Sequence, residues 1–245
     1  MPSRMELMPP PPALPADASL FLDLDGTLVE FAVSPDGIDV CDDLRALLKG
    51  LQSRLGGRLA VISGRALADL AGHLGLPDLA IAGSHGAERR HADGRFESAE
   101  IPPSIADAAA EAAAFADDHQ LIAEGKPMGV AVHFRSQPAL EETVDRFVAQ
   151  SAERHGLTVQ KGAMVRELRA PGRNKGDVVR LYMSEAPFDA GRPVMVGDDA
   201  TDEDAFEAVN ALGGASILVG PERPSLAQFR LPDVDSVKQW LAGRA

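Results

Sequence analysis

Residues 19–27 have the sequence Ser-Leu-Phe-Leu-Asp-Leu-Asp-Gly-Thr. A short apolar run, 19–22, is followed by two aspartates separated by one leucine, and then by a glycine and a threonine. The apolar part is short and continuous, which is typical of a strand buried on both faces. Asp23 and Asp25 follow it directly, and Gly26 permits the backbone to turn there. The segment therefore predicts a central strand that ends with two carboxylates at the edge of a sheet.

Four further short apolar runs extend this pattern along the chain, at residues 58–62, 79–82, 193–196 and 215–219. Segments with helical spacing lie between and after them, at residues 41–55, 66–74, after Asn174, 201–210 and about 234–241. Strands that alternate with helices favour a parallel sheet with helices on its faces. We therefore predict an α/β fold with a Rossmann-like, three-layer core.

The middle of the chain has a different pattern. An Ala-rich helix is expected at 105–115, a half-buried strand at 128–134, an amphipathic helix at 140–155 and a hairpin at 157–168. This α+β pattern predicts a cap domain at 89–170, inserted into a core made of 18–88 and 171–245. The six prolines among residues 1–16 predict a disordered extension at 1–17 rather than a signal peptide.

Composition narrows the possible partners. The chain has 24 basic and 37 acidic residues, a formal net charge of −13, and no Lys/Arg cluster, which argues against nucleic acid. No apolar run approaches the roughly 20 residues of a membrane span. The single cysteine excludes an intrachain disulfide and fits a reducing compartment. We expect a monomer that acts on a small molecule.

Polar motifs follow three of the predicted core strands, beginning at Asp23, Ser63 and Gly197. Ligands of open α/β sheets bind at the carboxyl ends of strands, so these motifs should meet in one crevice. There Asp23, Asp25, Asp198 and Asp199 would repel one another, and Mg²⁺ with oxygen ligands would relieve this repulsion. We assign all four as metal ligands.

The same crevice suits phosphoryl transfer. Asp23 is the expected nucleophile, which gives an aspartyl-phosphate, and Asp25 is the expected proton shuttle. Lys175, at a predicted helix start, would face the phosphate and Asp23. Four residues are expected to bind phosphate: Gly26, Thr27, Ser63 and Gly64.

Each motif also has an alternative interpretation. Ser63 could be a helix N-cap, Lys175 a surface lysine, and the acids after Asp199 an acidic helix start. A calcium loop from Asp23 is excluded, because Ser34 occupies the twelfth position, where a Glu is required. Asp202 is not expected to bind the metal itself; it would hold a metal-bound water or orient Lys175.

Taken together, Asp-x-Asp-Gly-Thr (23–27), Ser-Gly-Arg (63–65), Asn-Lys-Gly (174–176) and Gly-Asp-Asp-x-Thr-Asp-Glu-Asp (197–204) resemble the haloacid-dehalogenase (HAD) superfamily of phosphatases. An insertion between the second and third motifs is similar to its α/β cap class. The resemblance implies a HAD core with an inserted α+β cap that determines specificity.

A narrower set of motifs resembles the trehalose-6-phosphate phosphatases, from about residue 20 to 220: residues 83–88, 124–126, 133–135, 167–171 and 197–206. This resemblance implies Mg²⁺-dependent hydrolysis of trehalose 6-phosphate in the cytoplasm. It implies substrate binding by Arg65, His85, Glu124, Lys126, Arg135 and Glu167. Ala170 departs from the pattern by separating Arg169 from Pro171.

Other interpretations stay open. Residue chemistry alone favours an ordinary surface salt bridge for Glu124 and Lys126 and an exposed strand residue for Glu167. The enzyme could act on another sugar phosphate or be a mutase. A binding module that has lost catalysis is disfavoured, because Asp23, Asp25, Lys175 and Asp198 are all present.

Overall fold

The computed structural model describes residues 7–10, 13–31, 38, 40–126, 128–162 and 164–243. The chain forms two compact units. The first, called the core unit here, contains residues 1–98 and 173–245; the second, called the cap unit, contains residues 99–172. Each unit is described by itself.

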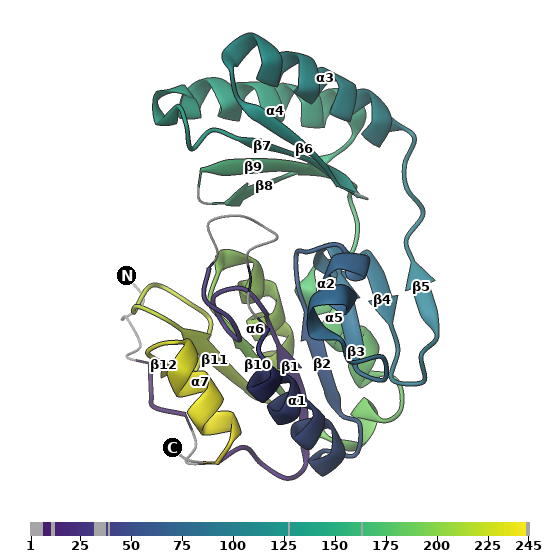
Figure 1. The fold of residues 1–245 in the computed structure, drawn as a ribbon, viewed down its shortest axis with the longest axis vertical. Helices are drawn as coiled ribbons and strands as arrows, with labels where there is room; N and C mark the ends of the chain where they lie inside the picture. Colours follow the sequence, from purple (N-terminus) through teal and green to yellow (C-terminus); the bar gives the residue numbers. More distant parts are fainter. Residues whose placement is uncertain are drawn as a thin grey trace. The chain divides into compact units, whose positions relative to one another are not determined.

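The core unit is built on an eight-stranded sheet in the order β12-β11-β10-β1-β2-β3-β4-β5 (Figure 1). The first six strands of this order are parallel, and β4 and β5 are antiparallel. The strand that precedes Asp23 is central and pairs with β10 and β2. The strands are β1 (Ala18–Leu22), β2 (Leu59–Ile62), β3 (Ala80–Gly83), β4 (Glu88–Arg90), β5 (Phe96–Ser98), β10 (Arg192–Gly197), β11 (Ala215–Val219) and β12 (Phe229–Leu231).

Helices cover both faces of this sheet. Leu20 and Leu22 pack with residues of α1, α2 and α7 on one face, whereas Phe21 packs with residues of α5 and α6 on the other. Every residue of β1 is buried, as expected for a central strand between two helical layers. The helices are α1 (Asp42–Arg54), α2 (Leu67–Leu74), α5 (Lys175–Met183), α6 (Glu203–Ala211) and α7 (Val234–Leu241), with short 3₁₀ helices η2 (Ser84–Gly86), η4 (Phe188–Ala190) and η5 (Ala200–Asp202). The predicted α/β class with three layers is confirmed.

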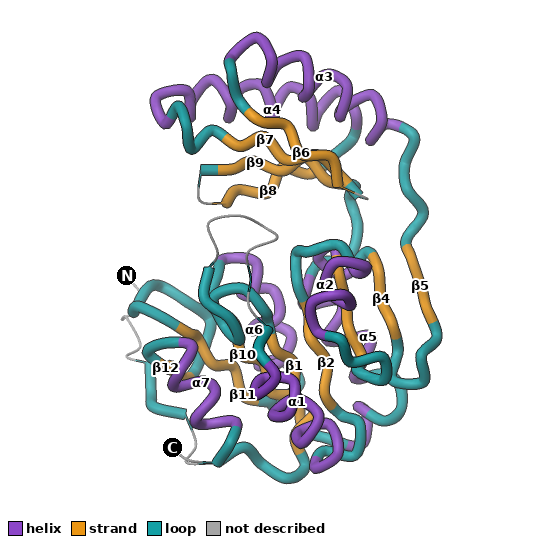
Figure 2. Tube along the Cα trace, viewed as in Figure 1, coloured by secondary structure: helices purple, strands orange, loops and turns teal. Residues whose placement is uncertain are grey.

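The cap unit is a four-stranded antiparallel sheet in the order β6-β7-β9-β8, with two helices on one face (Figure 2). Val130, Val132 and Leu168 point to the helices, and the alternate residues point to the opposite face. Its elements are α3 (Ser104–His119), β6 (Ile122–Lys126), β7 (Gly129–His133), η3 (Pro138–Leu140), α4 (Glu141–His155), β8 (Thr158–Gly162) and β9 (Val165–Arg169).

Two predicted boundaries require correction. Residues 89–98 were assigned to the insertion, but β4 pairs with β3 and β5 pairs with β4, so these residues extend the core sheet. The predicted disordered extension falls partly outside the described residues. Within them, Met8 pairs with Phe229, donating to the carbonyl of Gln228 and accepting from Arg230 N. That part of the extension is therefore attached to the edge strand of the core.

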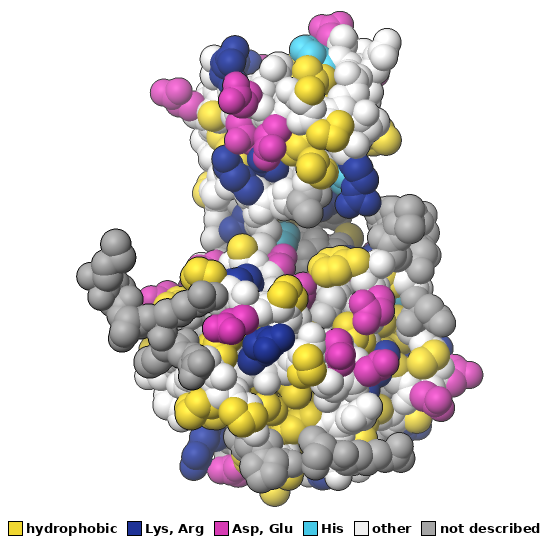
Figure 3. Space-filling view, turned by 90° about the vertical axis from the view of Figure 1, so that its left-hand side faces the viewer, with side chains coloured by type: hydrophobic (Ala, Val, Ile, Leu, Met, Phe, Trp, Pro, Cys, Tyr) yellow, Lys and Arg dark blue, Asp and Glu magenta, His cyan; other side chains and the backbone are white. Residues whose placement is uncertain are grey.

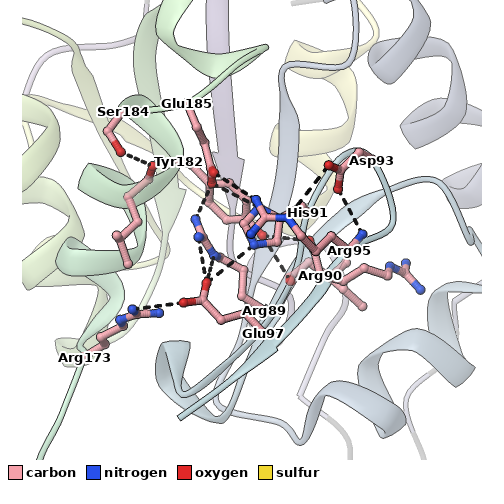
Figure 4. Close-up of polar contacts among 12 residues, drawn as sticks. Arg89, Arg90, His91, Asp93, Arg95, Glu97, Arg173, Tyr182, Ser184 and Glu185 are labelled. Carbon is pink, nitrogen blue, oxygen red and sulfur yellow. Dashed lines mark hydrogen bonds and ion pairs between the residues drawn. The ribbon is translucent and has the colours of Figure 1, made fainter.

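A network of charged side chains fastens β4 and β5 to the rest of the core unit (Figure 4). The guanidinium of buried Arg89 lies over the ring of Tyr182 and donates to Glu97 and Glu185. Glu97 also accepts from Arg173 at 3.3 Å. Glu97 lies just before the insertion and Arg173 directly after it. Their contact therefore joins the point at which the chain leaves the core unit to the point at which it returns.

Within the described residues, no helix is both long and apolar enough to cross a membrane. On the face drawn in Figure 3, Lys and Arg side chains lie scattered among acidic and apolar ones.

Candidate active site

The candidate site lies at the carboxyl end of the central strand. Asp23 follows β1 directly, donates its N–H to the carbonyl of Val196 at 3.0 Å, and is buried. Lys175 begins α5, because Asn174 and Asp177 form a reciprocal capping box at that point. The buried Lys175 Nζ donates to Asp23 Oδ1 at 2.7 Å and to Asp202 Oδ1 at 2.7 Å. The lysine is therefore not a surface residue.

Asp202 organises the backbone that carries Asp198 and Asp199. While its Oδ1 accepts from Lys175, its Oδ2 accepts from the N–H groups of Asp198 at 3.0 Å and Asp199 at 3.1 Å. Gly197 is required here, because a Cβ atom at that position would lie 2.3 Å from Asp202 Cγ. Both oxygens of this fully buried carboxylate are thus occupied within the protein.

Asp198 faces the end of β1. Its Oδ1 accepts from Thr27 Oγ1 at 3.2 Å, and a Cβ on Gly26, which has a φ of +81°, would lie 2.3 Å from its Oδ2. Carboxylate oxygens of Asp23, Asp198 and Asp202 all lie within 4.8 Å of one another. Asp199 instead accepts from Thr201 N at 2.8 Å and Thr201 Oγ1 at 2.6 Å, as the N-cap of η5.

The electrostatics of this cluster favour protons or a cation. Burial, then repulsion from Asp202 and Asp199, raises the pKa of Asp198 to about 7. Burial also raises the pKa values of Asp23 and Asp202, although Lys175 opposes both shifts. Burial alone would lower the pKa of Lys175, but the charges of Asp202 and Asp23 outweigh it and raise that pKa well above its usual range.

Asp199 behaves differently from its neighbours. Burial acts to raise its pKa, but the charge of Lys175 and the hydrogen bonds from Thr201 prevail, and its pKa is lowered. The lowered pKa favours the ionised form of Asp199. One of its oxygens, Oδ1, already accepts two hydrogen bonds from Thr201.

The donor set fits a hard divalent cation. Three carboxylates lie together with one lysine directly bonded to two of them, which leaves an excess of negative charge in a buried place. Oxygen ligands of this kind are those that Mg²⁺ accepts. Because both oxygens of Asp202 are occupied, Asp23 and Asp198 are the side chains best placed to hold the ion.

Asp25, also predicted as a metal ligand, is not among the three grouped carboxylates and pairs with Arg65. Its two oxygens accept from Arg65, from Nε at 2.7 Å and from Nη2 at 2.8 Å, and Arg65 Nη1 donates to Asp69 at 3.0 Å. The hydrogen bonds and charge of Asp25 raise the pKa of Arg65 above its usual range, although its partial burial opposes this. Arg65, predicted to bind substrate, therefore engages the predicted proton shuttle in this structure.

Ser63 and Gly64 follow β2 on the same side of the sheet. Ser63 is buried, and its Oγ accepts from Arg65 N at 3.2 Å. A Cβ on Gly64 would lie 2.6 Å from Cε1 of His85, so the glycine allows the imidazole of this buried residue to pack against the backbone. His85 has a φ of +54°, in the sparsely populated left-handed region.

Three predicted substrate residues of the cap unit share one face of its sheet. Glu124 and Glu167 both pair with Ala131 across β7, and Lys126 lies two residues beyond Glu124 on the same face, opposite the helices. Lys126 Nζ donates to Glu167 at 2.7 Å. Arg135 is exposed in the turn after β7.

Sequence reasoning missed several contacts at these sites. His133 Nε2 lies 2.8 Å from Glu124, and its place at i+4 of a strand starting at Gly129 puts it on the face that carries Glu124. Arg223 contacts the backbone of Asp198 and Asp199. Strand alternation could have found His133; no local pattern marks Arg223.

Comparisons with known proteins identify the family of the chain. A family model described as trehalose-phosphatase matches residues 21–235. A probable trehalose-phosphate phosphatase of Sinorhizobium fredii is 39% identical over 93% of this chain and 87% of its own length. The trehalose-6-phosphate phosphatase of Escherichia coli is 36% identical over 94% of this chain and 87% of its own length.

Solved structures show the same architecture. A trehalose-6-phosphate phosphatase related protein has a TM-score of 0.72 and 27% identity, covering 91% of this chain and 95% of that one. A haloalkanoate-superfamily (HAD) phosphatase of Bacteroides thetaiotaomicron has a TM-score of 0.62 and 16% identity, covering 99% and 96%, and supports the fold alone. The chain is thus a HAD-fold phosphoric monoester hydrolase that belongs to the trehalose-phosphatase family.

Proposed function

We propose that the protein hydrolyses trehalose 6-phosphate to trehalose and phosphate, with Mg²⁺, through an aspartyl-phosphate on Asp23. One observation carries the proposal: the carboxylate of Asp23, at the end of the central strand, accepts from Lys175 Nζ at 2.7 Å and lies within 4.8 Å of a carboxylate oxygen of Asp198. A nucleophilic carboxylate needs neighbouring positive charge to approach a phosphate dianion. Lys175 supplies part of that charge, and the bound ion would supply the rest.

In the first step, an oxygen of Asp23 attacks phosphorus while the sugar oxygen leaves. Lys175 holds Oδ1 of Asp23, which fixes the direction of the carboxylate and stabilises charge on the transferring group. Mg²⁺ held by Asp23 and Asp198 would neutralise charge on the phosphoryl oxygens. Thr27, Ser63 and the backbone of Gly26 and Gly64 stand at the neighbouring strand ends, where they would hold these oxygens.

Asp25 would give a proton to the leaving sugar oxygen and later take one from the attacking water. This role requires Asp25 to separate from Arg65, because both of its oxygens accept hydrogen bonds from that guanidinium. Asp202 serves both steps indirectly, since it orients Lys175 and the backbone of Asp198.

The substrate is proposed from the relatives and from the cap unit. The Escherichia coli relative carries the name trehalose-6-phosphate phosphatase. Glu124, Lys126 and Glu167 share one sheet face, where carboxylates would accept from sugar hydroxyls and the ammonium would donate to them. A cytoplasmic location and a monomeric state stay predictions.

The experiment is phosphate release from trehalose 6-phosphate by the wild type and by Asp23→Asn, with Mg²⁺ and with excess EDTA. Loss of the nucleophile should reduce kcat by about a thousandfold or more, and EDTA should abolish turnover reversibly. A panel with sucrose 6-phosphate, glucose 6-phosphate and glucose 1-phosphate tests the substrate. Unimpaired release by Asp23→Asn contradicts the mechanism, and a higher kcat/KM for another sugar phosphate contradicts the substrate.

A further inference from the structure

We propose that Arg223 is a positioning residue for the metal ligand Asp198, and that it acts as a clamp together with Glu203. The inference rests on the Mg²⁺ dependence proposed above. Arg223 lies in the segment between β11 and β12, outside every motif that predicted the site. It reaches the site through backbone contacts only.

Arg223 and Asp202 bond to the backbone of Asp198 and Asp199. Arg223 Nη2 donates to the carbonyl oxygens of Asp198 at 3.2 Å and Asp199 at 2.8 Å. From the other side, Asp202 Oδ2 accepts from the N–H groups of the same two residues. All four polar groups of this backbone segment are therefore held, the donors by Asp202 and the acceptors by Arg223.

Glu203 fixes the guanidinium in this position. It stands at the start of α6, and its Oε1 accepts from Arg223 Nη1 at 2.5 Å and from Ser225 Oγ at 2.8 Å. Its Oε2 accepts from Leu226 N at 2.7 Å, which ties the segment around Arg223 to the helix. Side-chain exposures of 30% for Arg223 and 23% for Glu203 show that both side chains are partly buried.

The direction in which the Kd for Mg²⁺ changes in an Arg223 variant distinguishes a positioning role from an electrostatic effect. Arg223 is a cation near a cation site, so by Coulomb's law alone its removal would tighten Mg²⁺ binding. If the guanidinium instead holds the Asp198 backbone in a ligating geometry, its removal weakens binding. Residues that orient a ligand in this way affect metal affinity by roughly 10- to 100-fold.

The test is titration calorimetry of Mg²⁺ into the metal-free full-length protein, comparing Arg223→Gln with Arg230→Gln. The second variant is a matched control, because it removes the same charge from the same part of the chain, where Arg230 Nε donates to the carbonyl of Gly220 at 2.7 Å. We expect Arg223→Gln to raise the Kd about tenfold and Arg230→Gln to leave it unchanged. The KM for Mg²⁺ should rise in parallel, with kcat at saturating Mg²⁺ preserved.

An unchanged or lower Kd in a folded Arg223→Gln protein overturns the proposal. If that variant does not fold, Arg223→Lys answers the same question, since it retains the charge and loses the planar guanidinium that donates from two nitrogens. Charge alone predicts no change for this variant, whereas positioning predicts a higher Kd, so an unaltered Kd there is equally contrary. A wild-type protein that binds no Mg²⁺ would instead contradict the metal dependence itself.

Discussion

Arg65 holds both carboxylate oxygens of Asp25, at 2.7 Å from Nε and 2.8 Å from Nη2. Each oxygen of Asp25 thus already accepts a charge-assisted hydrogen bond, which would compete with contact between this carboxyl group and a leaving group. Arg65 is itself held by Asp69. The pair is thus a resting arrangement of the proposed proton shuttle, and it must open before the leaving group is protonated.

Replacing Asp25 by Asn tests the shuttle through the leaving group. An alkoxide from a sugar needs a proton, whereas p-nitrophenolate does not, so the first step of Asp25→Asn should be slowed about 10²- to 10⁴-fold for the sugar phosphate and far less for p-nitrophenyl phosphate. Because hydrolysis of the aspartyl-phosphate also needs Asp25, rapid mixing should show a burst of one p-nitrophenolate per site. Equal slowing of both substrates without a burst would assign Asp25 another role.

Lys175 is expected to matter for stability as well as for activity. It is 3% exposed and bonded to two buried carboxylates, so Lys175→Met leaves uncompensated charge inside the core. Such a loss costs about 3–5 kcal/mol in the free energy of unfolding. Urea unfolding in EDTA measures it.

Lys161→Met is the matched control for that measurement. Lys161 also contacts an aspartate, at 2.8 Å, but its side chain is 65% exposed. An exposed ion pair contributes about 1 kcal/mol or less. If the two variants lose the same stability, the Lys175 cluster is not the buried network described here.

Asp198 should make the stability of the metal-free protein depend on pH. Its pKa in the folded state is about 7, above the ordinary aspartate value, so the folded protein binds more protons than the unfolded chain between these values. The free energy of unfolding should therefore fall as pH rises from about 4 to about 7. Mg²⁺ competes with the proton, so its stabilising effect should grow over the same range.

Thermal unfolding with EDTA or Mg²⁺ across this pH range measures both trends. Asp198→Asn cannot titrate, so its EDTA curve should fall less steeply with pH than that of the wild type, with Asp23 and Asp202 still contributing, and it should lose most of the Mg²⁺ effect. An EDTA curve that rises with pH for the wild type would contradict the assignment.

Glu167→Gln tests the sugar-binding face of the cap unit. The variant retains the shape of the side chain but weakens a charge-assisted hydrogen bond, so kcat/KM for trehalose 6-phosphate should fall roughly 10- to 100-fold. Hydrolysis of p-nitrophenyl phosphate, which has no sugar, should be nearly unchanged. Glu153→Gln, on an exposed position of α4, serves as the control. Parallel losses on both substrates would argue against a role in sugar binding.

The sequence predicted the elements that are strongly apolar. The run at 19–22 is buried throughout. A strand of such apolar composition is stable where both of its faces are covered, and helices cover both faces here. Apolar runs predict such strands because burial is what they report. The hairpin at 157–168 was predicted around a turn at Lys161-Gly162; it is present as β8 and β9, but Lys161 and Gly162 lie within β8 and are paired with β9.

Other features have no local pattern from which to predict them. β4 is Glu-Arg-Arg, and its place in the core sheet depends on partners such as Glu185, far along the chain. The contact of Arg65 with Asp25 joins residues 40 positions apart. An arginine can satisfy its donors with any nearby carboxylate, so its choice of partner follows from the assembled fold.

The contact between Glu97 and Arg173 has an evolutionary consequence. This ion pair shows that the two ends of the insertion at 99–172 return to neighbouring points of the core unit. Segments of other lengths and chemistries could therefore be exchanged at this junction without moving the strands that carry Asp23 and Asp198. Substrate preference could then change while the phosphate chemistry is retained.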